Sequence, residues 1–374
     1  MAMTPAATAV PLFAARTALE PLLDEVAARQ RAVLESGRYI LGPEVEAFES
    51  EFAAFLGVRH CIGVANGTDA LTIALRGLGI GPGDEVVVPA LTFYATAEAV
   101  VNAGAAPVFC DVDPRTLTMT AASAEAAIGD RTRALLPVHL FGNPAPMGAL
   151  RDLAAGAGLR LLEDAAQAAG ARLGGRRAGA LGDAATFSFM PAKNLGGFGD
   201  GGVVVTDDDE VAAAARRLRT HGSADRRTHT EVGYNSRLDE LQAAGLRVLL
   251  PHLGEWTAAR RRAAAAYAAS GLGDHVELPV ETAGGECCYH LYVVRSPRRE
   301  RLAAGLADAG IGARAYYTIP LHRQPAMAAH APPSPLPGAE GAAAESLALP
   351  MGPALSETDV ATVATAVAEV AAVG

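Results

Sequence analysis

Short, almost continuously apolar segments recur along the first two thirds of this chain, and helical patterns separate most of them. Segments that are apolar on both faces are typical of a parallel β-sheet covered by helices on both sides. The alternation therefore predicts an α/β fold with a mostly parallel sheet between helices. The expected strands are Val86–Val88, Val108–Asp111, Ala134–Val138, Leu159–Leu162, Ala185–Phe189 and Gly202–Thr206, and the expected helices include Asp69–Leu78, Tyr94–Asn102 and Met147–Gly156.

A smaller α+β region is expected toward the C-terminus. A long helical pattern covers Arg237–Ser270, and Pro251 can interrupt it. Beyond it we expect a strand at Tyr289–Arg295, helices at Glu300–Ala309 and Glu357–Val373, and a loop at Ala331–Gly338. We therefore divide the chain into an N-terminal arm (residues 1–15), a large domain (16–250) and a small C-terminal domain (251–374).

Composition excludes several classes of protein. The 374 residues carry a formal net charge of −10, which does not fit a nucleic-acid-binding surface. No apolar run is long enough to span a bilayer, and the first charged side chain is Arg16, so no basic leader is visible. The four cysteines lack a C-x-x-C spacing, which favours buried free thiols and no metal site. These features predict a cytoplasmic protein.

Lysine occurs once in the chain, at Lys193, while arginine supplies every other basic side chain. A guanidinium stays protonated near neutral pH, whereas a nucleophilic amine must lose its proton. The lone lysine also follows an expected strand and precedes a glycine-rich loop, Gly196–Gly202. These glycines come before a strand and not before a helix, so they do not form a dinucleotide-binding fingerprint. We expect Lys193 to be a reactive amine and not a solvated surface residue.

Two further motifs favour a ligand site. In Asn66-Gly67-Thr68-Asp69 a loop enters a helix, which suits either an anion site or an ordinary N-cap. Glu163 and Asp164 end a buried strand, and successive side chains point to opposite faces of a sheet. A carboxylate there can hold the protonated ring nitrogen of a cofactor or can cap a loop. His139 ends another strand and suits a structural or a functional role equally.

The order of these motifs resembles fold-type I pyridoxal-phosphate (PLP) enzymes and, within them, the DegT/StrS-type sugar-nucleotide aminotransferases. The resemblance runs from about Gly42 to Pro353 and departs from the family at Met190-Pro191-Ala192 and Tyr316-Tyr317-Thr318. Its phrases are NGTDAL (66–71), EDAAQAAGA (163–171), FSFMPAKNLGGFGDGG (187–202), GYNSRLDELQAA (233–244), YHLYVVR (289–295) and PLHRQPA (320–326).

The resemblance implies a role for each matching residue. Lys193 would bind PLP covalently and carry protons, and Asp164 would pair with the ring nitrogen. Phe93 would stack on the ring, Gln167 would bond near its hydroxyl, and Gly67, Thr68 and Ser188 would hold the phosphate. Asn235 would reach the neighbouring subunit's cofactor, which implies a homodimer with shared active sites, and His322 would lie near the substrate.

The same resemblance implies the reaction. Glutamate would donate an amino group to a keto-deoxysugar carried by a nucleotide. The segments FSFMPAKNLGGFGDGG and HLFGNPAPM (139–147) are most similar to the branch that aminates dTDP-linked 3-keto-6-deoxyhexoses at C3. Alternatives are a 4-keto sugar nucleotide, a cyclitol, or a non-catalytic regulator on the same fold. A nicotinamide oxidoreductase lacks its fingerprint.

Overall fold

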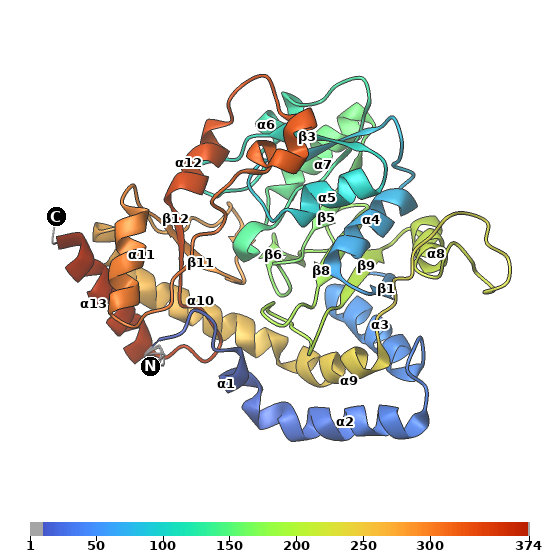
Figure 1. Cartoon of the computed structure of the whole chain (residues 1–374), viewed down its shortest axis with the longest axis horizontal. Helices are drawn as coiled ribbons and strands as arrows, with labels where there is room; N and C mark the ends of the chain where they lie inside the picture. The colour runs from blue at the N-terminus through green and yellow to red at the C-terminus, as the bar shows by residue number, and fades with distance from the viewer. Residues whose placement is uncertain (1–9, 373–374) are drawn as a thin grey trace, which may run out of the picture.

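The computed structural model describes residues 10–372, so most of the expected N-terminal arm lies outside the described residues. A seven-stranded sheet forms the centre of the larger part of the molecule (Figure 1). Its strands, in spatial order, are β1 (His60–Val64), β9 (Gly202–Thr206), β8 (Ala184–Ser188), β5 (Arg160–Asp164), β4 (Thr132–Leu135), β2 (Glu85–Pro89) and β3 (Ala106–Cys110).

The sheet is mostly parallel, as predicted. Strands β8, β5, β4, β2 and β3 pair in parallel, while β9 runs antiparallel to both of its neighbours, β8 and β1. The predicted strands all lie within or overlap these elements, but β1 was not predicted. Because β9 returns antiparallel, the ends of β1 and β8 meet at the same edge of the sheet, opposite Gly202.

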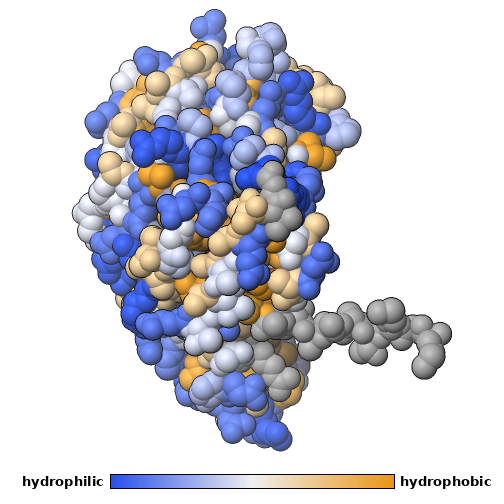
Figure 2. All heavy atoms as spheres, turned by 90° about the vertical axis from the view of Figure 1, so that its left-hand side faces the viewer, coloured by the Kyte–Doolittle hydropathy of each residue, from blue (hydrophilic) through white to orange (hydrophobic). Residues whose placement is uncertain are grey.

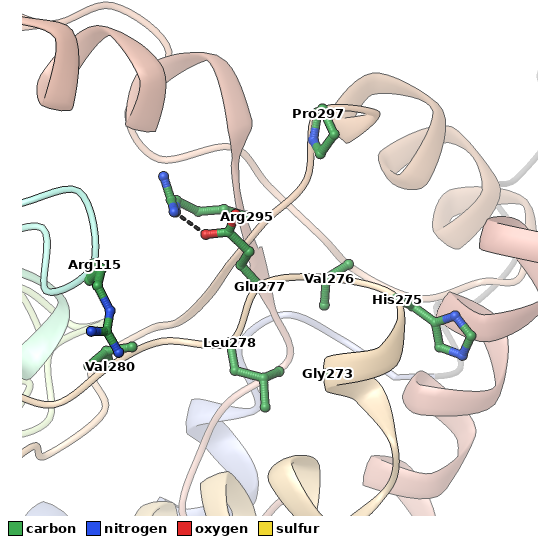
Figure 3. Close-up of a pocket in the computed structure, with 9 residues that line it drawn as sticks. All are labelled: Arg115, Gly273, His275, Val276, Glu277, Leu278, Val280, Arg295 and Pro297. Carbon is green, nitrogen blue, oxygen red and sulfur yellow. Dashed lines mark hydrogen bonds and ion pairs between the residues drawn. The ribbon is translucent and has the colours of Figure 1, made fainter.

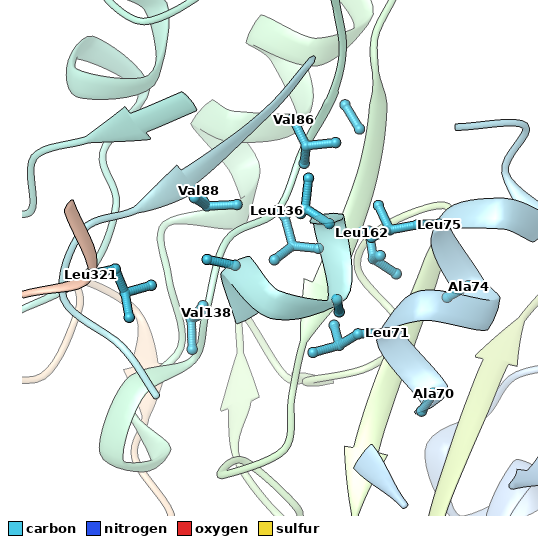
Figure 4. Close-up of a cluster of buried hydrophobic side chains, with 14 of the residues drawn as sticks. Ala70, Leu71, Ala74, Leu75, Val86, Val88, Leu136, Val138, Leu162 and Leu321 are labelled. Carbon is cyan, nitrogen blue, oxygen red and sulfur yellow. The ribbon is translucent and has the colours of Figure 1, made fainter. Parts of the chain in front are cut away.

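Helices cover both faces of the sheet, which confirms the two-sided arrangement. On one face, Leu71 and Leu75 of α4 (Gly67–Gly77) pack toward Val86, Leu136 and Leu162 of the sheet region (Figure 4). On the other face, Val87 packs against α7 (Met147–Ala157), and Phe187 packs against α3 (Pro43–Leu56) and α9 (Glu240–Leu249). The helices of this part are α1 (Ala15–Leu19), α2 (Leu23–Ser36), α3 (Pro43–Leu56), α4 (Gly67–Gly77), α5 (Ala95–Asn102), α6 (Ala121–Glu125), α7 (Met147–Ala157), α8 (Asp209–Leu218) and α9 (Glu240–Leu249).

The C-terminal region has a core of its own around Tyr267, Tyr292 and Val367. A short 3₁₀ turn at Leu250–His252 separates α9 from α10, which confirms the interruption at Pro251. Its elements are α10 (Leu253–Ala269), β11 (Tyr292–Arg295), α11 (Arg299–Asp308), α12 (Pro337–Glu345), β12 (Ser346–Leu349) and α13 (Glu357–Ala372). Strand β12 pairs antiparallel with β11 and was not predicted. The domain boundaries stay a prediction.

The short strands β6 (Arg172–Leu173), β7 (Arg176–Arg177) and β10 (Gly285–Glu286) form a separate three-stranded sheet. All four cysteines are buried and free, as expected. On the face in Figure 2, apolar residues are scattered among hydrophilic ones. Within residues 10–372 no helix is long and apolar enough to cross a membrane. The cytoplasmic location stays a prediction.

Candidate active site

A cavity of about 670 Å³ opens where the parallel strands end. This edge of an open α/β sheet is where ligands usually bind. Asp164 is the last residue of β5, and Ser188 is the last residue of β8. Seven predicted site residues line the cavity: Gly67, Thr68, Phe93, Asp164, Gln167, Ser188 and Lys193.

Lys193 reaches the cavity from the loop that joins the antiparallel strands β8 and β9. The Phe189 amide donates to the Gly201 carbonyl at the base of this loop (2.8 Å), and the Lys193 amide donates to Met190 (2.8 Å). A side chain at Gly196 would collide with the Pro191 carbonyl, so the turn requires glycine. Burial lowers the pKa of the Lys193 amine to about 8, against the opposing charge of Asp164.

Asp164 is a buried carboxylate, with 5% of its surface exposed. Its Oδ2 accepts from Thr96 Oγ1 (2.8 Å), and its Oδ1 accepts from the Ala166 amide (3.1 Å). Burial raises the pKa of Asp164, although both hydrogen bonds and the charge of Lys193 lower it. The carboxylate is therefore fixed in orientation and lacks a full counter-charge.

Glu163 points to the opposite face, as strand alternation predicted. It accepts from the amides of Gly179, Leu181 and Gly182 (2.6–2.8 Å). It also bonds His139 Nε2 (2.8 Å), whose Nδ1 accepts from the Ala145 amide (3.0 Å). Glu163 and both ring nitrogens of His139 thus have hydrogen-bond partners, and neither residue lines the cavity. Of the two roles considered for His139, the geometry fits the structural one.

The first turn of α4 forms one wall of the cavity. Its N-cap is Asn66, whose side chain accepts from the Asp69 amide (2.8 Å). Neither Thr68 nor Asp69 is therefore the cap, and the N–H groups of Gly67 and Thr68 begin the helix without intrahelical partners. A Cβ at Gly67 would lie 2.8 Å from the Ser188 Cβ, so glycine permits this close approach. Such a helix start beside a hydroxyl suits an anion.

An aromatic wall closes another side of the cavity. Gln167 Oε1 accepts from the Phe141 amide (2.8 Å), and its Nε2 donates to the Tyr317 hydroxyl (3.1 Å). The Tyr317 ring lies 6.0 Å from Phe93 and 6.2 Å from Phe141 between centroids. Sequence reasoning treated Tyr316-Tyr317 only as a departure from the family pattern. It also missed Thr96 and the cavity-lining His290 of YHLYVVR.

Two predicted site residues lie elsewhere. His322 is buried, but its Nε2 bonds Glu340 (3.0 Å) and its ring packs near Phe109, outside the residues that line the cavity. Asn235 is exposed and forms a β-bridge with Thr220, also outside the cavity of its own chain.

A second hollow of about 580 Å³ lies in the C-terminal region (Figure 3). It is lined by Arg115, His275, Glu277 and Arg295, among others, and includes no predicted site residue. Glu277 and Arg295 form an ion pair with each other across it. The cavity at Lys193 therefore remains the candidate active site.

A half-buried lysine, a fixed carboxylate and a helix N-terminus meet at the sheet edge, an arrangement that fits the fold-type I class of aminotransferases. Comparison with known sequences identifies the family. The profile of the DegT/DnrJ/EryC1/StrS aminotransferase family matches residues 22–368, and the chain belongs to that family.

Individual relatives are similar along nearly their whole length. The dTDP-3-amino-3,4,6-trideoxy-alpha-D-glucose transaminase of Streptomyces venezuelae is 50% identical, over 96% of each chain. A pleiotropic regulatory protein of Geobacillus stearothermophilus is 46% identical, over 93% of this chain and 95% of that one. The crystal structure of S. venezuelae DesV in complex with a ketimine intermediate is 49% identical, with a TM-score of 0.94 over 96% of this chain and 98% of that one.

Proposed function

We propose that this enzyme is a PLP-dependent transaminase that moves an amino group from glutamate to the ketone of a nucleotide-linked deoxysugar. One observation carries the proposal. The only lysine of the chain lies in the same cavity as a buried carboxylate and a free helix N-terminus. This combination of amine, carboxylate and anion site suits a cofactor with an aldehyde, a basic ring nitrogen and a phosphate.

The residues present fit that cofactor. Asp164 is buried with a raised pKa, so a protonated ring nitrogen would supply the counter-charge that its surroundings lack. Gly67, Thr68 and Ser188 would hold the phosphate at the start of α4. Phe93 is 54% exposed in a cavity wall, which leaves its face free to stack on a ring. When bound, PLP supplies an electron sink for proton removal from the amino-acid donor.

The chain's own residues would divide the remaining work. With a pKa of about 8, Lys193 holds a useful fraction of neutral amine near neutral pH and can give and take protons there. Phe141 and Tyr317 hold the Gln167 amide, and the second Nε2 hydrogen of Gln167 would be available to the ring hydroxyl that we assign to it. Thr96 holds Asp164 in one orientation without adding charge.

A homodimer with shared active sites forms part of the proposal, with Asn235 acting in the partner's site. Asn235 is exposed and does not line the cavity of its own chain, which supports a role in trans. Two exposed apolar side chains, Phe93 and Met190, also line the cavity, and a partner would cover them. The His322 ring bonds Glu340 and does not point at the cavity. We therefore propose that the chain around His322 lies near the substrate, and not its imidazole.

Cofactor attachment tests the central assignment. Purified enzyme reduced with borohydride should carry one PLP adduct, mapped by mass spectrometry to Lys193. Lys193→Arg protein should fold but show neither the yellow band nor the adduct. An adduct on the N-terminal amine, the only other primary amine, would contradict the role of Lys193. This test also addresses a regulatory function without catalysis, which the relative named as a regulatory protein suggests.

For the substrate, we propose amination at C3 of a dTDP-linked 3-keto-6-deoxyhexose. Support comes from the transaminase relative whose name places its amino group at C3. A pocket in register for C3 would hold a C4 ketone about 1.5 Å away, and a misplacement of about 1 Å can cost ~100-fold in rate. Incubation of the pyridoxamine form with 3-keto and 4-keto sugar nucleotides, followed by NMR, locates the new amine. An amine at C4, or equal rates, would refute the C3 assignment and leave the aminotransferase standing.

A further inference from the structure

A side cavity of about 240 Å³ adjoins the active-site cavity. The two share Phe13, Ala192 and Lys193 among their lining residues. At roughly 30 Å³ per water, the side cavity has room for about eight waters or one small organic molecule. Its lining includes the polar side chains of Lys193, Asn194 and Arg260 and the indole of Trp256, and no aspartate or glutamate within residues 10–372 lines it.

Arg260 is a buried cation without an anion. The side chain, on α10, is 7% exposed, and within the described residues it forms no ion pair. Its Nη1 donates to the Tyr289 carbonyl (3.0 Å), its Nε has no partner, and its Nη2 has none within residues 10–372. The next residue, Arg261, contrasts with it, because its Nη1 pairs with Glu281 (3.1 Å).

The surroundings of Arg260 supply no negative charge. Burial lowers the pKa of Arg260 only to about 10, so the guanidinium stays protonated at neutral pH. Burial also raises the pKa of the nearby Cys288 thiol to about 12, which keeps that thiol neutral. A buried charge without a counter-ion costs several kcal/mol, and an anion from solution would offset that cost.

Neutral polar groups fix the geometry between Arg260 and Lys193. Asn194 Nδ2 donates to the Cys288 carbonyl (3.0 Å), so its Oδ1 faces His290 Nδ1 (3.3 Å) as an acceptor. Burial first, and then the charges of Lys193 and Arg260, hold the pKa of His290 well below its usual value. His290 is therefore neutral, and the side cavity is lined by two basic side chains and, within the described residues, by no carboxylate.

We propose that Arg260 binds a carboxylate of the amino-acid donor in the side cavity. The inference rests on the proposed transaminase function and names the residue that recognises its donor. In an α-amino acid one carbon atom separates the carboxylate from the amino group. A carboxylate held by Arg260 would therefore keep the amino group on the Lys193 side, where the two cavities meet. The carboxylate would also supply the missing counter-charge, and the guanidinium fork suits its two oxygens.

The test separates the two half-reactions of the cofactor-loaded enzyme by their absorbance changes. Glutamate would convert the pyridoxal form of the enzyme to the pyridoxamine form, and the keto-sugar nucleotide would convert the pyridoxamine form back to the pyridoxal form. For Arg260→Gln we expect the apparent Kd for glutamate to rise about 10- to 100-fold, the range of a lost hydrogen bond to a charged group. The second-order rate constant of the glutamate half-reaction, divided by that of the keto-sugar half-reaction, should fall at least ~10-fold. Arg261→Gln, whose arginine already has a carboxylate partner, is the matched control and should leave the ratio unchanged.

Binding of glutarate, which cannot react, provides a readout that does not depend on turnover. Calorimetry on the loaded enzyme should give weaker glutarate binding for Arg260→Gln than for wild type and Arg261→Gln. Arg260→Lys keeps the charge, packs more conservatively and should recover part of the affinity. Equal glutarate affinity in all variants, or equal losses in both half-reactions, would overturn the inference. Wild-type enzyme that does not react with glutamate at all would instead overturn the proposed function.

Discussion

The pKa of the Lys193 amine can be measured directly and tests the electrostatics of the site. Burial lowers the pKa of its amine from 10.5 to about 8, with Asp164 opposing the shift. At pH 7 the neutral fraction then rises from about 0.03% to about 10%, roughly 300-fold, because each pH unit is a factor of ten. We therefore expect the cofactor-free enzyme to expose a reactive amine at neutral pH. Asp164→Asn should lower the pKa further, because it removes the charge that stabilises the ammonium.

The single lysine makes this titration direct. Brief acetylation of the cofactor-free enzyme across the alkaline range, followed by mass spectrometry, can label only Lys193 and the N-terminal amine. The labelling rate at Lys193 should reach half its maximum near pH 8 in folded protein. In denaturant it should move close to the ordinary lysine pKa. A midpoint above pH 10 in the folded enzyme, or no downward shift in Asp164→Asn, would refute the electrostatic account of the site.

Two further predictions concern the assembled enzyme. Asp164→Asn should bind PLP but transaminate about 100-fold more slowly, or ~2.7 kcal/mol of barrier, in single-turnover kinetics, and near-normal turnover would remove its role. Mixed Lys193→Ala and Asn235→Ala subunits should regain a fraction of activity, because one hybrid site recovers both groups. The absence of recovery despite proven subunit exchange would count against shared sites.

The local pattern of the sequence predicted six of the seven strands of the large sheet, but it missed β1 and also missed β12 of the C-terminal region. Short apolar runs such as Ala184–Ser188 are bounded by turn residues, so they could be recognised as strands from the sequence alone. Strand β1 carries His60 and Gly63, and its main stabilisation comes from β9, which is far away in the sequence. Strand β12 directly follows α12, and its short apolar run cannot be distinguished from more helix without knowledge of β11. Both misses are failures to foresee non-local pairing.

Some residues of the candidate site could be predicted from the sequence, and others could not. Asp164 could be predicted because it ends a strand, and Lys193 because it is the only lysine and follows a strand closely before a glycine-rich loop. Tyr317 and Arg260 come from the C-terminal third of the chain, and only the folded packing brings them to the two cavities. The segment of His322 does approach the site, since the Leu321 amide donates to Ala90, but the imidazole turns away to Glu340. Sequence position alone cannot determine which way such a side chain points.

Two basic side chains lie beside the active site, Lys193 half-buried and Arg260 buried, and their pKa values account for why one is an amine and the other a guanidinium. Burial lowers the pKa of both, yet Lys193 falls to about 8 while Arg260 falls only to about 10. At neutral pH the amine can therefore release its proton and react, whereas the guanidinium keeps a permanent charge for an anion. A chain that uses arginine at every other basic position can place arginine at 260 without loss. At position 193 the same replacement would fix a proton that the proposed chemistry has to move.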